Sequence, residues 1–146
     1  MILMNIDGAA RGNPGPAGYG VHVCTPNGET VEEAYGYVGE QTNNFAEYTA
    51  LLAALKLAQL RGWSEVHIRS DSQLMVRQLN GEYKVKNEVL ARFYRQALRE
   101  KSKLKRCRIE HVLRGDNKEA DKLANKAVDE MASQPPEINP ILVKKS

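Results

Sequence analysis

The sequence predicts an α/β fold: a five-stranded mixed sheet with helices on its faces. Apolar residues have the spacing of short strands up to residue 38, and from residue 44 the spacing becomes helical. Three strands joined by short turns predict an antiparallel meander. The two later strands alternate with helices, which predicts parallel pairing through right-handed crossovers. A chain of 146 residues with 42% hydrophobic and 27% charged residues is long and apolar enough for one folded domain with its own core.

Turn-forming residues separate the three strands of the predicted meander. The first strand covers residues 2–6 and ends at Asp7-Gly8. The second covers residues 19–24, after a loop with two glycines and two prolines, and the third covers residues 30–38, after a Pro-Asn-Gly turn. The meander therefore occupies the N-terminal part of the domain.

Helices and strands alternate in the rest of the chain. Two further strands are predicted over residues 65–70 and 106–113. Helical spacing covers residues 44–60, stopped by Gly62, and then residues 72–79, 87–101 and 117–131.

The C-terminal residues have a composition of their own. Three prolines predict an irregular tail over residues 133–146, after one folded domain over residues 1–132. Ile138, Ile141 and Leu142 are too apolar for a fully solvated end, so the tail is predicted to dock on the domain.

Charge is unevenly distributed along the chain. The net charge is +3, but residues 82–108 contain ten Lys/Arg and three Asp/Glu, a local charge of +7, which leaves −4 for the remainder. This favours a polyanionic partner, although a solvated cationic helix face would give the same pattern. No apolar run is long enough for a membrane span, and no signal peptide is predicted. Two widely spaced cysteines fit a reduced, cytoplasmic protein, which we expect to be a monomer.

Four carboxylates occupy positions where a sheet protein builds a site. Asp7 and Asp71 each follow a predicted strand, and Glu47 and Asp121 each lie in the first turn of a predicted helix. Every one has a structural alternative. Asp7-Gly8 can be a plain turn. Asn44 can be an N-cap with Glu47 completing a capping box, Asp71 can cap the next helix, and Asp121 can pair with Lys118.

Taken together, the four carboxylates favour a metal site. Glu47 shares a helical row with Leu51 on the buried side, and Asp121 lies beside the apolar stripe of its helix. Several carboxylates directed at one region repel each other unless cations lie between them. Oxygen ligands with little nitrogen or sulfur nearby suit Mg²⁺ or Mn²⁺, and two such ions catalyse phosphoryl transfer in many enzymes.

Four sequence blocks resemble type 1 ribonuclease H over residues 1–128. They are Asp-Gly-Ala with Gly-Asn-Pro-Gly at residues 7–15, Thr-Asn-Asn-Phe-Ala-Glu at 42–47, Ser-Asp-Ser-Gln at 70–73 and Asn-Lys-Glu-Ala-Asp at 117–121. The resemblance implies the ribonuclease H-like fold and an endonuclease that cuts the RNA strand of an RNA–DNA hybrid by a two-metal mechanism. The products would carry 5′-phosphate and 3′-hydroxyl ends, and the cofactor would be two Mg²⁺ ions, which Mn²⁺ could replace.

The resemblance also implies roles for individual residues. Asp7, Glu47, Asp71 and Asp121 match the catalytic, metal-binding carboxylates. Asn13, Asn43 and Gln73 match residues that contact the hybrid near its minor groove, and Thr42 and Asn87 match residues that hold a phosphate of the DNA strand. The loop at Gly12 lets the backbone approach the nucleic acid closely.

The chain departs from many family members in two places. It resembles the compact prokaryotic form, with no hybrid-binding module before Asp7 and no long basic protrusion after Gln73, so affinity would depend on Lys84, Lys86 and the basic helix after them. The loop at residues 113–117 is short and lacks the histidine of longer loops. Arg114 is the candidate substitute as a phosphate-binding cation, or it is a plain surface residue.

Two other functions remain open from the sequence. The same fold and metals could act with relaxed specificity that includes double-stranded RNA. A non-catalytic nucleic-acid-binding module is disfavoured, because four carboxylates weaken the binding of a polyanion.

Overall fold

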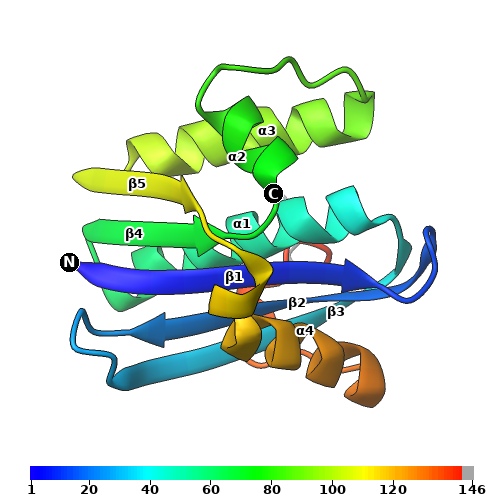
Figure 1. Cartoon of the computed structure of the whole chain (residues 1–146), viewed down its shortest axis with the longest axis horizontal. Helices are drawn as coiled ribbons and strands as arrows, with labels where there is room; N and C mark the ends of the chain where they lie inside the picture. Colours follow the sequence, from blue (N-terminus) through cyan, green and yellow to red (C-terminus); the bar gives the residue numbers. More distant parts are fainter. Residues whose placement is uncertain (143–146) are drawn as a thin grey trace.

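The predicted mixed sheet is confirmed in the computed structural model, which describes residues 1–142 (Figure 1). The strand order is β3-β2-β1-β4-β5. Strands β1, β2 and β3 pair antiparallel, whereas β4 and β5 extend the sheet from β1 in parallel. The strands are β1 (Ile2–Ala10), β2 (Gly15–Cys24), β3 (Thr30–Gln41), β4 (Glu65–Ser70) and β5 (Arg106–His111).

Helices cover both faces of the sheet. Helix α1 packs on β1 and β2 with α3 beside it, and α4 packs on the opposite face, where it lies in front of β2 in Figure 1. No helix among residues 1–142 is long and apolar enough to cross a membrane. The helices are α1 (Asn43–Arg61), α2 (Gln73–Leu79), α3 (Glu88–Ser102) and α4 (Lys118–Glu130), with short 3₁₀ turns η1 (Arg114–Asp116) and η2 (Pro136–Ile138).

Strand β1 is longer than predicted, and this changes the position of Asp7. Parallel pairing with β4 ends at Ile6↔Ser70, but antiparallel pairing with β2 continues from Asp7↔Gly20 to Ala10. The prediction that β1 ends at Asp7 is therefore wrong. Asp7 lies inside the strand, at the point where its parallel neighbour stops and leaves one side of the strand open.

Helix α1 begins before the predicted residue, which excludes the capping box. Thr42 is the N-cap, and its side chain accepts a hydrogen bond from the Phe45 N–H at 3.1 Å. Glu47 therefore lies beyond the first turn rather than within it, and Asn44 is not the cap. At the other end, Gly62 has the left-handed conformation (φ 75°) that ends the helix, as predicted.

The C-terminal segment docks on β3 and α1, but not through every predicted residue. Gln134 forms a bridge with Tyr35, and the buried Asn139 donates from Nδ2 to the Tyr37 carbonyl at 3.0 Å. Ile138 is 1% exposed and belongs to the core. Ile141 and Leu142 are 43% and 57% exposed, so docking through these two side chains, as predicted, is wrong; the remaining four residues of the tail lie outside the described part of the chain.

We expect Ile138 to contribute strongly to stability. Ile138→Ala would leave a cavity in the core and lower the free energy of unfolding by about 2–4 kcal/mol. Ile141→Ala is the matched control, with an expected loss below about 0.5 kcal/mol, because that side chain is exposed. Urea unfolding of both variants measures the difference, and equal losses would contradict the docked arrangement.

Candidate active site

Three of the four predicted carboxylates converge at the carboxyl end of β4. Asp7 comes from β1, Glu47 from α1 and Asp71 from the residue after β4, and one oxygen of each lies within 4.8 Å of the others. Parallel pairing of β1 with β4 brings Asp7 beside Asp71. Asp7 and Glu47 are buried. The N-cap of α2 is Ser72, which accepts from the Met75 N–H, so Asp71 is not a helix cap.

Close packing of α1 against β1 determines the position of Glu47. Its Oε1 accepts a hydrogen bond from the Gly8 N–H at 2.8 Å. A Cβ at Gly8 would lie 2.2 Å from the Ala46 carbonyl carbon, so only glycine allows this approach. The interpretation of Asp7-Gly8 as a plain turn is therefore wrong. This role of Gly8 was not predicted from the sequence, where the only local sign is a glycine inside an apolar strand pattern.

The fourth carboxylate, Asp121, lines the same open cavity of about 520 Å³ but is not one of the three clustered groups. Helix α4 carries it toward the sheet. The buried Asn117 at the start of α4 donates from Nδ2 to the Ile6 carbonyl at 2.8 Å, immediately before Asp7. This anchor, which sequence analysis also missed, fixes α4 relative to β1. None of the ion pairs among the described residues joins Asp121 to Lys118.

The electrostatics of the cluster fit a cation site. Burial and the nearby charges of Glu47 and Asp71 raise the pKa of Asp7. Burial also raises the pKa of Glu47, although the hydrogen bond from Gly8 partly opposes this. Such carboxylates are unfavourable as free anions and favourable as ligands. Because the donors are carboxylate oxygens, the set suits hard divalent ions such as Mg²⁺ or Mn²⁺.

Asn13 and Asn43 connect two segments at the edge of this cavity. Asn13 Oδ1 accepts from the Asn43 N–H at 3.0 Å, and Asn43 Oδ1 accepts from the Ala10 N–H at 2.9 Å. Backbone donors therefore fix the orientation of both amides. Each Nδ2 group is left as a donor without a partner among residues 1–142, on an exposed side chain. The pair offers two directed donors to a ligand above the cavity.

Thr42 and Asn87 are helix N-caps, and their side-chain oxygens also accept hydrogen bonds from backbone N–H groups. The Thr42 hydroxyl oxygen caps α1, and Asn87 Oδ1 caps α3 by accepting from the N–H groups of Val89 and Leu90 at 2.9 and 3.1 Å. The oxygens are used by the backbone, so the hydroxyl hydrogen and the Nδ2 group are available as donors. Donors beside helix N-termini are suited to bind phosphate.

Comparison with known proteins agrees with this geometry. A family model described as "Reverse transcriptase-like" matches residues 5–127. A ribonuclease H of Pseudomonas putida is 34% identical over 149 residues, covering 91% of this chain and 97% of that protein. The chain belongs to the type 1 ribonuclease H family. This family consists of metal-dependent endonucleases.

Two further matches show how much of each protein is similar to this chain. The crystal structure of LC11-RNase H1 in complex with an RNA/DNA hybrid superimposes with a TM-score of 0.85 and 41% identity, covering 90% of this chain and 99% of that one. A bifunctional protein of Mycobacterium tuberculosis is 43% identical over 132 residues. The matched region is 90% of this chain but only 36% of that protein.

The other residues predicted to contact substrate do not all line the carboxylate cavity. Arg114 lines it together with the carboxylates, whereas Gln73, the first residue of α2, borders a separate hollow beside β5. Gly12 is exposed in the loop between β1 and β2, with a φ of 95°. Lys84 and Lys86 are exposed between α2 and α3 and do not line the carboxylate cavity.

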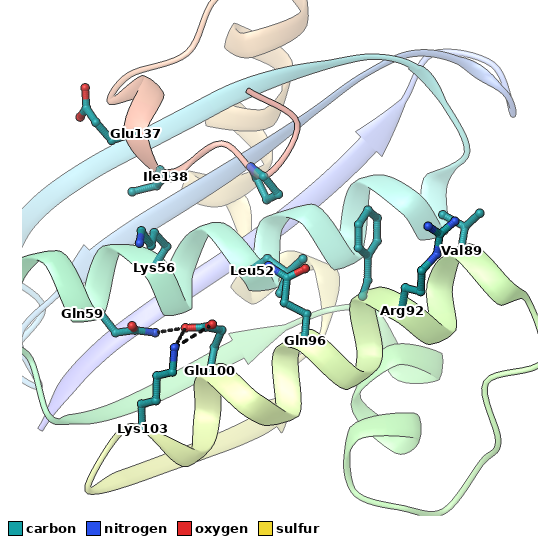
Figure 2. A pocket seen from close by; sticks show the side chains of 12 residues that line it. Leu52, Lys56, Gln59, Val89, Arg92, Gln96, Glu100, Lys103, Glu137 and Ile138 are labelled. Atoms are coloured by element: carbon teal, nitrogen blue, oxygen red, sulfur yellow. Dashed lines mark hydrogen bonds and ion pairs between the residues drawn. The ribbon is translucent and has the colours of Figure 1, made fainter. Parts of the chain in front are cut away.

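A second cavity of about 400 Å³ lies outside the candidate active site. Figure 2 shows it between α1, α3 and the C-terminal segment, with Leu52 and Ile138 among its lining residues. Glu100 is held there by Gln59 and Lys103. None of the four carboxylates lines this cavity, so it is separate from the candidate active site.

Proposed function

We propose that this chain is an endoribonuclease that hydrolyses the RNA strand of RNA–DNA hybrids, leaving 5′-phosphate and 3′-hydroxyl ends. The observation that carries the proposal is the convergence of Asp7, Glu47 and Asp71 within 4.8 Å, with Asp121 in the same cavity. These carboxylates would hold two Mg²⁺ or Mn²⁺ ions, whose chemistry would be to activate a water molecule and stabilise the leaving oxygen.

In this proposal the protein binds the metal ions and orients the substrate, and no side chain acts as a nucleophile. The four carboxylates hold the ions, and the Gly8 N–H orients Glu47 toward the cluster. Arg114 is the one cation that lines the cavity among the described residues, so we assign it a phosphate oxygen as its ligand.

The directed amide donors support a hybrid as the substrate. A protein that distinguishes RNA from DNA must contact the 2′-hydroxyl, which accepts as well as donates. The Nδ2 groups of Asn13 and Asn43 can donate to it or to base acceptors in the minor groove, and Gln73 lies exposed at the start of α2 for a similar contact. Thr42 and Asn87 donate to a phosphate of the DNA strand.

A substrate panel tests the proposed function. Labelled RNA–DNA hybrid, RNA duplex and DNA duplex of one sequence are incubated with Mg²⁺, Mn²⁺ or a chelator. We expect cleavage of the RNA strand in the hybrid alone, with either metal, and none with the chelator. Equal cleavage of the RNA duplex would replace hybrid specificity with the relaxed alternative, and cleavage in the chelator would exclude the metal mechanism.

Asn43→Asp tests the role of the amide donor. The aspartate keeps an oxygen for the Ala10 N–H and loses the Nδ2 donor, so we expect cleavage of the hybrid to fall by about 10-fold or more. Asn44→Asp adds the same charge one residue away and should cause a smaller loss. Rates with hybrid are compared with DNA duplex binding for each variant. Parallel losses in cleavage and in duplex binding would argue against a 2′-hydroxyl contact.

Lys84 and Lys86 are expected to provide affinity rather than rate. Replacing both with Gln should raise KM several-fold with kcat nearly unchanged, and should flatten the salt dependence of KM, because phosphate contacts persist from the ground state to the transition state. Lys105→Gln with Arg106→Gln removes two charges at the start of β5, which is the end of the sheet away from the carboxylates. This double change should alter KM less. If the two double variants behave alike, the binding surface does not include residues 84–86.

A further inference from the structure

The loop between β1 and β2 is attached to α4 by one side chain, that of Arg11. Its Nη2 atom lies 2.6 Å from Asp129 Oδ1, 3.3 Å from Asn125 Oδ1 and 3.4 Å from the Asn125 carbonyl oxygen. Asn125 in turn donates from Nδ2 to the Asp121 carbonyl one turn earlier. The contact joins residues 118 positions apart, and it connects the loop with the helix that carries the fourth carboxylate.

The opposite side of the same loop is attached to α1. Asn13 accepts from the Asn43 N–H, and Asn43 accepts from the Ala10 N–H. The Arg11 N–H closes the loop on the Pro16 carbonyl at 2.8 Å. Gly12 and Asn13 therefore lie on a short exposed segment that is fixed from both sides, by α1 through the asparagines and by α4 through Arg11.

We propose that Arg11 is a positioning residue, which holds the β1–β2 loop against Asp129 so that Gly12 and Asn13 face the nucleic acid in a fixed relation to Asp121. The inference rests on the proposed function for its substrate but not for its geometry. Fixing a binding loop before the ligand arrives lowers the entropy lost on binding. No pattern in the sequence predicts this role of Arg11.

The exposure of the pair indicates that its effect is on binding and not on global stability. The side chains of Arg11 and Asp129 are 48% and 62% exposed, and exposed ion pairs contribute little to the free energy of unfolding. Residues 10 and 43, which the loop contacts, belong to β1 and α1, and we expect both elements to stay folded when the pair is removed. The consequence of losing the pair is a mobile loop on an intact domain.

A direct contact between Arg11 and a phosphate is the competing explanation, and it predicts an opposite effect at Asp129. If Arg11 acts through Asp129, then removing either partner releases the loop and weakens hybrid binding. If Arg11 binds phosphate itself, removing Asp129 frees the guanidinium and strengthens hybrid binding. The two partners therefore distinguish the explanations.

The experiment measures Arg11→Met, Asp129→Asn and the double variant with hybrid substrate. We expect each single change to raise KM about 3- to 10-fold with kcat within about twofold, and the double variant to be no worse than the larger single effect. Arg11→Lys should recover part of the loss. Glu119→Gln with Lys122→Met, which removes another exposed pair on α4, is the control and should leave KM unchanged.

Amide hydrogen exchange provides a readout that does not need catalysis. Two N–H groups report on the attachment of the loop to α1: that of Asn43, which donates to Asn13, and that of Ala10, which donates to Asn43. Both should exchange faster in Arg11→Met and Asp129→Asn than in the control. A lower KM in Asp129→Asn would overturn the proposal in favour of direct phosphate binding. Unchanged exchange and unchanged KM in both single variants would overturn it altogether. Absence of hybrid cleavage by the unmodified chain would instead refute the proposed function, with exchange still testing Arg11.

Discussion

Asp7→Asn is expected to abolish hybrid cleavage and to stabilise the metal-free protein. An amide holds Mg²⁺ poorly, so the cleavage rate should fall by about 10³-fold or more. Asp7 is 5% exposed, and burial together with Glu47 and Asp71 raises its pKa, so the carboxyl is an unfavourable group without a cation. Removing its charge should raise the free energy of unfolding in chelator by about 1–3 kcal/mol. Cleavage assays and urea unfolding measure the two effects.

The opposite pair of results would support a structural role for Asp7. A residue that served only in a turn or cap would lose about 0.5–2 kcal/mol of stability on substitution and leave activity intact. Asp116→Asn is a useful control, because Asp116 is an exposed carboxylate in η1 that does not line the cavity. We expect that variant to keep both its stability and its activity.

Gly8→Ala is expected to be the most destabilising single-methyl change in the site. The added Cβ would lie 2.2 Å from the Ala46 carbonyl carbon and 2.4 Å from the Glu47 nitrogen, and both are backbone atoms that cannot rotate away. Helix α1 would have to move from β1, which breaks the bond between the Gly8 N–H and Glu47. The expected loss is about 3 kcal/mol or more in the free energy of unfolding, with cleavage strongly reduced.

Gly115→Ala is the matched control for Gly8. A Cβ at Gly115 would have no neighbour within 4 Å, so its addition should change stability by less than about 0.5 kcal/mol. Urea unfolding of the two variants under identical conditions gives the comparison. A tolerated alanine at residue 8 would show that α1 does not depend on this close approach, and the position of Glu47 would need another explanation.

The strand and helix order could be predicted because each element has its own local pattern. Residues 65–70 were predicted as a strand with the observed bounds, and Gly62 ends α1 as expected. The largest error falls where tertiary pairing extends an element: β1 continues past Asp7 because β2 pairs with it beyond the end of β4. The last strand was predicted to residue 113 but ends at His111, where its pairing with β4 stops. Such pairing leaves no local pattern in the sequence.

The carboxylates could be predicted as a group, whereas the atoms that position them could not. Asp71 follows the end of β4 and Glu47 lies on the buried side of α1, as predicted, whereas Asp7 lies inside β1, beside the end of β4. The Gly8 N–H and the Asn117 side chain contact residues 39 and 111 positions away, and their roles depend on the approach of α1 and α4 to β1. Short-range spacing carries no information on these distances.

Thermal unfolding with Mg²⁺ or with chelator tests most directly whether the carboxylate cluster is a metal site. Metal bound to the folded state stabilises the unmodified protein by mass action, by about 1.4 kcal/mol at ten times the dissociation constant. We predict that Mg²⁺ raises the melting temperature of the unmodified protein and leaves that of Asp7→Asn nearly unchanged. Equal increases in both proteins, or no increase in either, would contradict the assignment of these carboxylates as the metal ligands.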